Sequence, residues 1–291
     1  METSDLEHVL WLGGMSGVGK TTSGRAVARK YDLRFYSLDS YTLDHHRNRV
    51  DPAEHPALHS FDTLTVEELW VETNGREIAD RFELASRERF AFVLDDLRAL
   101  PRDAPVLVEG PQLLPDLVAP LVTSHPCQAL YLVADSELQR RLVEQRGGAS
   151  YQRSSDPERA ANNRTERDRV LSERVRTAAE RFGLAVKEVR DPTEAPTLIE
   201  AQFRHVLDAW DLQGDRGDVS QRRREENSAR LRQWRMYAEE SGQAPDVELP
   251  LACECRNPGC TLTVPITLKD AESARARSLP LQAPAHRAAL A

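Results

Sequence analysis

A glycine-rich segment ending in lysine and threonine, G-x-x-x-x-G-K-T at residues 14–21, has the residue types needed to hold a triphosphate. Gly14, Gly17 and Gly19 let the backbone turn sharply and approach phosphate oxygens with no side chain in the way. Lys20 adds a mobile positive charge for the β- and γ-phosphates, and the hydroxyl of Thr21 can ligate Mg²⁺. This chemistry indicates binding of ATP or GTP.

The flanking segments favour the same interpretation of this Walker A pattern. Residues 9–12 are apolar and predict a strand before the loop, and residues 20–30 predict a helix after it. In that order the amides of the loop and of the first helical turn converge on the anion. A glycine-rich surface turn that carries Lys-Thr is the alternative. The predicted nucleotide-binding residues are Gly14, Ser16, Gly17, Val18, Gly19, Lys20, Thr21 and Thr22.

Strands and helices are predicted to alternate after the loop. Short apolar runs typical of buried strands occur at residues 33–37, 105–110, 129–134 and 184–189. Segments with helical character lie at residues 63–73, 76–100, 136–146, 160–182 and 197–210. This alternation predicts an α/β fold with a parallel sheet flanked by helices on both faces. Ligands of such sheets bind beyond the carboxyl ends of the strands.

Two acidic residues follow predicted strands at that edge of the sheet. Asp39 comes after the second strand, and Glu109 ends the third. Each carboxylate could orient the water shell of Mg²⁺ or take the proton from an attacking hydroxyl. Asp39 could instead cap a helix or a turn, and Glu109 could pair with Lys20 in an empty site. We expect both to face the nucleotide.

An arginine cluster follows the fourth predicted strand, and Arg164 and Arg167 are its candidates for catalysis. Because they are three positions apart, they share one face of the predicted helix, and their charge could stabilise a phosphoryl group in transfer. Gly147 and Gly148 would make this segment flexible. A solvated helix face is the alternative for any single arginine. The cluster comprises Arg140, Arg141, Arg146, Arg153, Arg159, Arg164, Arg167 and Arg169.

Residues 8–210 resemble the P-loop kinases of small molecules and nucleoside monophosphates. The resemblance is carried by the loop, by SLDSY at residues 37–41, by VEGPQLLP at 108–115 and by NRTERD at 163–168; the last two phrases resemble bacterial kinase-like proteins. It implies ATP-dependent phosphoryl transfer to a small-molecule acceptor bound over residues 39–89, with a lid at the arginine cluster. Glu109 departs from the family pattern, because an aspartate is usual in the Walker B position. No guanine-reading N/T-K-x-D pattern is evident, which favours ATP.

The bulk composition excludes several classes of partner. The formal net charge of −8 disfavours general attraction to nucleic acid, although a kinase of nucleic-acid ends or nucleotide sugars stays open. The first residues do not resemble a signal peptide, and no apolar run is long enough to cross a bilayer. We therefore expect a cytoplasmic protein.

The chain is predicted to divide into a P-loop domain (residues 1–210), a polar linker (211–226) and a C-terminal module (227–291) made of a helix and a cysteine-containing segment. Cys253, Cys255 and Cys260 form a C-x-C-x₄-C pattern. It resembles a C-terminal segment found on several kinds of bacterial protein. With His286 as the fourth ligand the thiolates could hold Zn²⁺; structural thiols or a redox pair are the alternatives. This module suggests the second functional hypothesis, a nucleotide-sensing ATPase that acts through the module on a protein partner.

Overall fold

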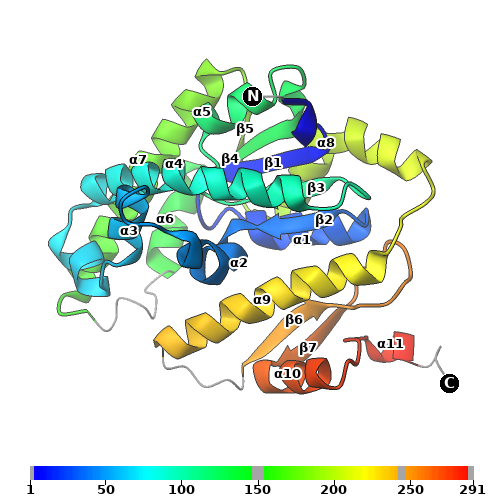
Figure 1. Cartoon of the computed structure of the whole chain (residues 1–291). Coiled ribbons are helices and arrows are strands. Elements are labelled where there is room, and N and C mark those ends of the chain that lie inside the picture. The colour runs from blue at the N-terminus through cyan, green and yellow to red at the C-terminus, as the bar shows by residue number, and fades with distance from the viewer. Residues whose placement is uncertain (1–2, 146–153, 242–246, 288–291) are drawn as a thin grey trace.

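A five-stranded parallel sheet forms the centre of the computed structural model, which describes residues 3–145, 154–241 and 247–287 (Figure 1). The strand order is β2-β3-β1-β4-β5, and all neighbours are parallel. The strands are β1 Val9–Gly14, β2 Arg34–Ser37, β3 Val106–Glu109, β4 Ala129–Ala134 and β5 Ala185–Val189, with β6 Glu248–Ala252 and β7 Thr263–Thr267 in a separate antiparallel pair. The helices are α1 Lys20–Lys30, α2 Leu38–Tyr41, α3 Pro56–Asp62, α4 Gly75–Ala99, α5 Pro115–Val118, α6 Ser136–Gln145, α7 Pro157–Arg181, α8 Ala195–Leu212, α9 Val219–Ser241, α10 Leu268–Ala276 and α11 Pro284–Arg287.

The two faces of the sheet carry separate cores because alternate residues of each strand point to opposite sides. Val9 and Trp11 of β1 face one core, which α4 and α7 cover. Leu10 and Leu12 face the other core, which α1 and α8 cover. All four strand residues are at most 1% exposed. The predicted α/β fold, with helices on both faces of a parallel sheet, is confirmed.

Local signals explain where the two longest helices begin. The side chain of Asn74 accepts a hydrogen bond from the backbone N–H of Glu77 at the start of α4. Asp156 does the same for Arg159 at the start of α7, where Pro157 occupies the first helical position. Both helices are 25 residues long, so they reach from the core to the edge of the sheet where the loop lies.

The structure differs from the sequence prediction in the polar segment before the C-terminal module. Residues 211–226 were expected to form a linker, but α9 begins at Val219. Residues 63–73, predicted as a helix, contain only the single π-helical turn η4, Glu68–Glu72, after a short helical start. The sequence pattern did not predict the strand β6 or the helices α3 and α10.

Ion pairs in which at least one partner is largely buried explain why the charged start of α9 is helical instead of solvated. Arg222 pairs with Asp103, and Arg223 pairs with Asp32. Both arginine side chains are at most 5% exposed. Further pairs join Glu225 to Arg34 of β2 and Glu226 to Arg25 and Arg29 of α1. Partners this far away in the chain cannot be recognised from a local charge pattern.

The helix α9 consequently lies along the edge strand β2 and joins the C-terminal module to the P-loop domain (Figure 1). Its other side packs on β6 and α10, where Leu231, Leu249 and Leu268 share a small core. An edge strand presents unpaired backbone groups, and a covering helix is one way to shield them. The module is therefore packed against the sheet.

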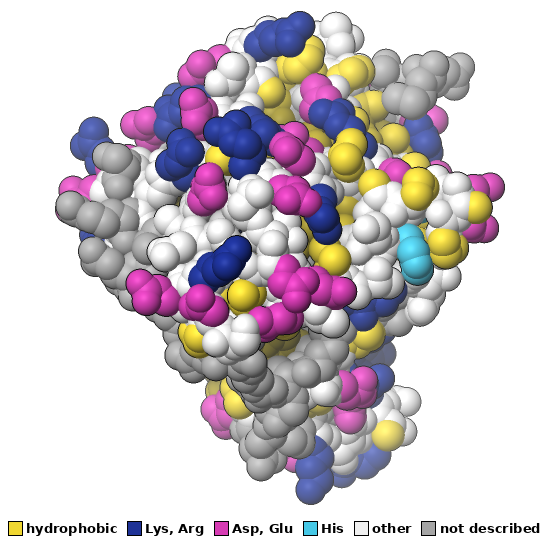
Figure 2. Space-filling model, turned by 90° about the vertical axis from the view of Figure 1, so that its left-hand side faces the viewer, with side chains coloured by type: hydrophobic (Ala, Val, Ile, Leu, Met, Phe, Trp, Pro, Cys, Tyr) yellow, Lys and Arg dark blue, Asp and Glu magenta, His cyan; other side chains and the backbone are white. Residues whose placement is uncertain are grey.

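Charges of both signs are interspersed on the surface that faces the viewer in Figure 2. Such a face offers no broad basic area to a nucleic-acid backbone. Among the residues that the structure describes, no helix has both the length and the apolar character needed to span a bilayer.

We predict that Arg222→Ala lowers the free energy of unfolding by about 2–3 kcal/mol, because it removes a buried partner of Asp103 at the contact between α9 and the sheet. Arg235→Ala is the matched control, since Arg235 also forms an ion pair from α9, with Glu272, but is 52% exposed. The control should change stability by no more than about 0.5 kcal/mol. Urea denaturation followed by circular dichroism measures both values, and equal effects would contradict the role of the buried pair.

Candidate nucleotide-binding site

The loop between β1 and α1 has the backbone geometry that the glycines predict. Gly14, Gly17 and Gly19 have φ values of 108°, 93° and 83°, in the region that favours glycine. A Cβ atom at Gly14 would lie 2.0 Å from the carbonyl oxygen of Leu132 in β4, so no other residue fits there. The side chain of Val18 is fully buried, which fixes the loop against the core below it.

Lys20 and Thr21 begin α1 directly after this loop. Lys20 is 5% exposed, and its Nζ donates a hydrogen bond of 2.6 Å to the carbonyl oxygen of Met15. The lysine therefore folds back across the loop that is expected to hold the phosphates. The Thr21 hydroxyl donates a hydrogen bond of 3.0 Å to Oε1 of Glu109, which places it beside the carboxylate expected to organise a metal.

Glu109 is the centre of the site because β3 lies between two strands whose ends place hydrogen-bond donors beside it. It is in register with Leu12 of β1 on one side and with Ser37 of β2 on the other. The Ser37 hydroxyl donates a hydrogen bond of 2.6 Å to Oε1. Burial raises the pKa of Glu109, and the charge of Asp39 adds to this, while Lys20 and the two hydrogen bonds oppose it. The sequence pattern pointed to Glu109 but missed Ser37, which only the register identifies.

Asp39 lies in α2, two residues after β2, and its side chain is exposed. Oδ1 is 3.5 Å from Nε2 of Gln112 in the segment that follows β3. The site thus contains two carboxylates in contrasting environments, one buried and hydrogen-bonded, the other open to solvent. Such pairs are the usual basis for dividing acid–base and electrostatic roles.

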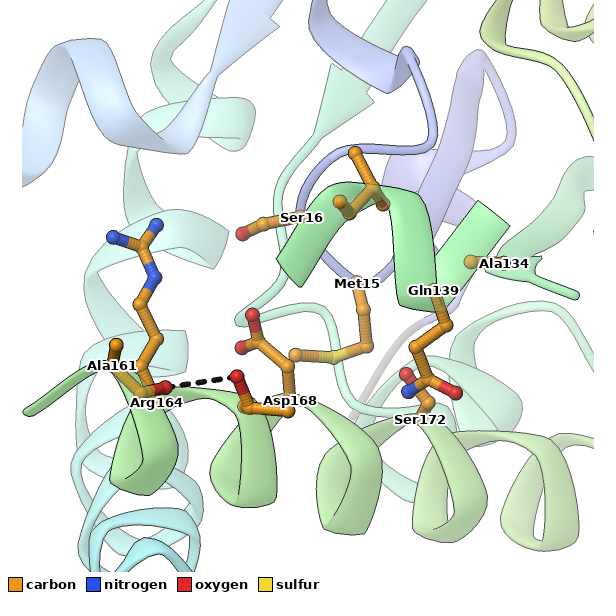
Figure 3. A pocket seen from close by; sticks show the side chains of 10 residues that line it. Met15, Ser16, Ala134, Gln139, Ala161, Arg164, Asp168 and Ser172 are labelled. Carbon is orange, nitrogen blue, oxygen red and sulfur yellow. Dashed lines mark hydrogen bonds between the residues drawn. The ribbon is translucent and has the colours of Figure 1, made fainter. Parts of the chain in front are cut away.

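The helix α7 forms the wall opposite the loop (Figure 3). Arg164 and Asp168 of α7 line a cavity of about 40 Å³ with Met15 and Ser16 of the loop. Arg167 instead lies over the ring of Trp70, 5.1 Å from its centroid, and pairs with Asp168. The two arginines do share a helix face, since Arg164 also lies 5.9 Å from the centroid of Trp70. Only Arg164 lines the cavity at the loop.

The rest of the predicted arginine cluster is spread over several surroundings. Arg146, Gly147, Gly148 and Arg153 lie outside the described residues, as does the side chain of Arg140. Arg141 donates a hydrogen bond to the carbonyl oxygen of Arg190. Arg169 pairs with Glu173 on the same helix and is more than half exposed, so it matches the solvated alternative.

The segment expected to bind the acceptor, residues 39–89, is occupied largely by structural contacts. Arg89 is 3% exposed and donates hydrogen bonds of 2.7 and 2.9 Å to Asp62. Arg87 pairs with Asp116. The fully buried His46 is 3.0 Å from Asp96. Both arginines of this segment therefore already have carboxylate partners.

Asp96 is hydrogen-bonded to several side chains of this region, and no sequence pattern indicated its role. Tyr36 donates a hydrogen bond of 2.6 Å to it, and Arg49 one of 2.8 Å, in addition to contacts with His45 and His46. Burial alone would raise the pKa of Asp96, but hydrogen bonds from His46, Tyr36 and His45 lower it to about 2. This arrangement fixes the segment that follows α2, the helix that carries Asp39.

The cysteines and the histidine of the C-terminal module form a second cluster. One ligand atom from each of Cys253, Cys255, Cys260 and His286 can be chosen so that all lie within 4.8 Å of one another. Burial raises the pKa of Cys260 to about 11. Burial also opposes ionisation of Cys255, but hydrogen bonds to its sulfur lower its pKa below the usual value. The cluster is thus a candidate metal site.

One family of known proteins resembles part of the chain. The sequence model of the ATPase family associated with various cellular activities (AAA) matches residues 10–110. This segment is about a third of the chain and runs from β1 to the end of β3, so it contains the loop, Asp39 and Glu109. It includes neither the arginines of α7 nor the cysteines. No curated protein matches the chain.

Together, the parallel sheet, the loop geometry and the family match show that the chain has a P-loop NTPase fold, and the match supports ATP binding through a P-loop. The matched family is described as an ATPase family, and the match gives no specific support to the transferase activity implied by the resemblance in sequence.

We predict that Asp96→Asn lowers the free energy of unfolding by about 2 kcal/mol at pH 7. The folded-state pKa of Asp96 is depressed, so its stabilisation is present above the unfolded pKa and is lost as the pH falls through the folded value. The difference from wild type should therefore shrink to about half by pH 3. Asp95→Asn is the control, because Asp95 is 62% exposed. Denaturation between pH 3 and pH 7 tests this, and a difference that stays constant over that range would contradict it.

Proposed function

We propose that the protein is an ATP-dependent kinase that transfers the γ-phosphoryl group to a hydroxyl of a small molecule. Lys20 contacts the β- and γ-phosphates, and the Thr21 hydroxyl ligates Mg²⁺. Glu109, already hydrogen-bonded to Thr21, orients the metal's water shell. In this proposal the substrates are ATP and the acceptor, and Mg²⁺ is the only metal that the reaction needs.

The observation that carries the proposal is the exposed carboxylate of Asp39 beside the buried Glu109. Hydrolysis needs a group that positions one water molecule, and Glu109 is close enough to Thr21 to serve a metal-bound water. A transferase also needs a group that accepts a proton from the acceptor molecule. A second carboxylate, open to solvent at the same edge of the sheet, provides that group. Asp39 can accept the proton of an incoming hydroxyl group.

Arg164 supports the proposal because of its place in the cavity beside the loop. Charge spreads over the oxygens of the phosphoryl group during transfer, and a guanidinium group next to them lowers the barrier. Arg164 lines the cavity with Ser16, whereas Arg167 lies over Trp70 and Phe82. We assign the charge-stabilising role to Arg164 and a supporting electrostatic role to Arg167.

Lys20→Ala should abolish nucleotide turnover, with a loss of at least about 10²-fold, because the phosphates lose their mobile cation. The variant should keep its fold, since the hydrogen bond from Lys20 to the carbonyl oxygen of Met15 stays within the loop. Release of phosphate or ADP from ATP and Mg²⁺ measures the rate, and circular dichroism checks the fold. Turnover at the wild-type rate by a folded variant would overturn the assignment of the site.

Asp39→Asn should reduce phosphoryl transfer by about 10²–10⁴-fold, because the general base is lost, while ATP binding remains close to wild type. The acceptor can be found by incubating the protein with ATP labelled in the γ-phosphate and a pool of small metabolites, then separating the labelled products. Asp208→Asn is the matched control, because Asp208 is an exposed carboxylate on α8. Transfer that is unaffected by Asp39→Asn would exclude Asp39 as the base.

A nucleotide-sensing ATPase is the second candidate, and two observations favour it. The matched family consists of ATPases. In addition, the hydroxyl of Ser40, next to Asp39, donates a hydrogen bond of 2.9 Å to Gln233 of α9. Through this contact, a conformational change at α2 would alter the position of the C-terminal module. Under this hypothesis ATP is hydrolysed with no transfer to any metabolite, and a protein partner binds the module only in one nucleotide state.

A further inference from the structure

We propose that Cys253, Cys255, Cys260 and His286 bind one structural Zn²⁺ ion, and that this ion fixes a turn that holds the end of the P-loop helix α1. The turn, residues 253–260, is called the cysteine turn below. This function is separate from phosphoryl transfer and needs no nucleotide.

The distances within the cluster match a tetrahedral zinc site. Nδ1 of His286 is 3.4 Å from the sulfur of Cys253 and 3.7 Å from that of Cys260. With Zn–S and Zn–N bonds of about 2.3 and 2.0–2.1 Å, tetrahedral geometry places sulfur and nitrogen ligands about 3.5–3.6 Å apart. Three thiols and one imidazole are also a donor set typical of structural zinc.

The ligands come from the cysteine turn between β6 and β7 and from α11, and nearby groups donate hydrogen bonds to two of the sulfur atoms. Cys253 and Cys255 follow β6, Cys260 precedes β7, and His286 belongs to α11. The backbone N–H of Ala283 donates to the sulfur of Cys253 at 3.3 Å, and Arg223 donates to that of Cys255 at 3.4 Å. Such outer contacts orient thiolate ligands and stabilise their charge.

Glu254, between the first two cysteines, explains how the cysteine turn keeps its shape. Its carboxylate is fully buried and pairs with Arg275 of α10. It also accepts hydrogen bonds of 2.9 Å from Asn227 of α9 and from the backbone N–H of Leu281. The two sulfur atoms therefore project from a backbone that α9 and α10 hold in place.

The same turn binds the P-loop domain at Asp32, which follows α1 and has a φ of 54°. The backbone N–H of Gly259 donates to Oδ2 of Asp32 at 2.7 Å, and Arg223 donates to Oδ1 at the same distance. Arg223 also donates to the carbonyl oxygen of Cys255. Asp32 is 4% exposed, so the carboxylate depends on these donors, and the turn must be held in position to supply one of them.

The alternatives explain fewer of these facts. A disulfide would use two of the three sulfur atoms and leave the third, with His286, unexplained. Free structural thiols would not require an imidazole nitrogen within 3.7 Å of two sulfur atoms. A metal ion accounts for all four side chains at once.

The first test is metal content. Protein purified without chelator should carry about one equivalent of zinc per chain by inductively coupled plasma mass spectrometry. Replacement with Co²⁺ should give the charge-transfer and ligand-field absorption of a tetrahedral thiolate site. Less than about a tenth of an equivalent, even after incubation with zinc under reducing conditions, or an intramolecular disulfide found by mass spectrometry, would overturn the proposal.

Cys260→Ser tests the ligand assignment, and Cys127→Ser is the matched control because Cys127 lies outside the cluster, 3.3 Å from His205. We expect Cys260→Ser to bind zinc at least about 10²-fold more weakly, while Cys127→Ser keeps the full equivalent. Removal of zinc from wild type should lower the melting temperature by more than about 5 °C. Identical zinc content in both variants would contradict the assignment.

Hydrogen exchange tests the contact with α1. Chelation of zinc from the wild-type protein should raise exchange at the end of α1 and at residues 31–33, with no nucleotide present. In Asp32→Asn, exchange there should already be raised and should respond little to chelation, although the variant still binds zinc. If chelation leaves exchange of α1 unchanged in wild type, the ion does not act on the P-loop helix. Neither result depends on whether the protein is a kinase.

Discussion

The hydrogen bonds that Glu109 accepts from Thr21 and Ser37 are the interaction on which the site depends. They join the start of the P-loop helix to the ends of two neighbouring strands through one buried carboxylate. Because β3 lies between β2 and β1 in the sheet, parallel pairing of the strands is enough to bring these groups together. A carboxylate buried in this way costs free energy unless it is hydrogen-bonded or neutralised. Its position is therefore strongly determined, and Mg²⁺ and Lys20 are the natural sources of compensating charge when a nucleotide binds.

The C-terminal module extends this arrangement to the edge of the sheet. Buried ion pairs from α9 reach α1, β2 and the segment before β3, and the cysteine turn adds a contact with Asp32 at the end of α1. The helix α1 is thus held at its start by the hydrogen bond between Thr21 and Glu109 and at its end by the module. Such buried pairs are costly to form but strongly destabilising to break, which makes the position of α9 specific.

The extent to which the sequence predicted this structure depends on how local each signal is. The loop glycines and the apolar strand runs act over a few residues, and they predicted the sheet, the loop and Glu109. Ser37 and Asp96 acquire their roles from strand register and from helices far apart in the chain, which no single-sequence pattern reports. The charged residues 222–226 resembled a solvated linker because the partners of Arg222, Arg223, Glu225 and Glu226 lie about 120 to 200 residues away. The cysteine pattern indicated the cluster that the structure brings together, whereas Glu254 and Asp32, which support the turn, resembled ordinary surface acids.

The central claim, that the loop at residues 14–21 holds the phosphates of ATP, is tested most directly by calorimetric titration of the protein with ATP in the presence of Mg²⁺. The account predicts one saturable site per chain with release of heat, and a marked loss of affinity when Mg²⁺ is omitted, because Thr21 and Glu109 then have no ion to organise. A titration that registers neither heat nor a shift in melting temperature, with protein that is folded by circular dichroism, would contradict it.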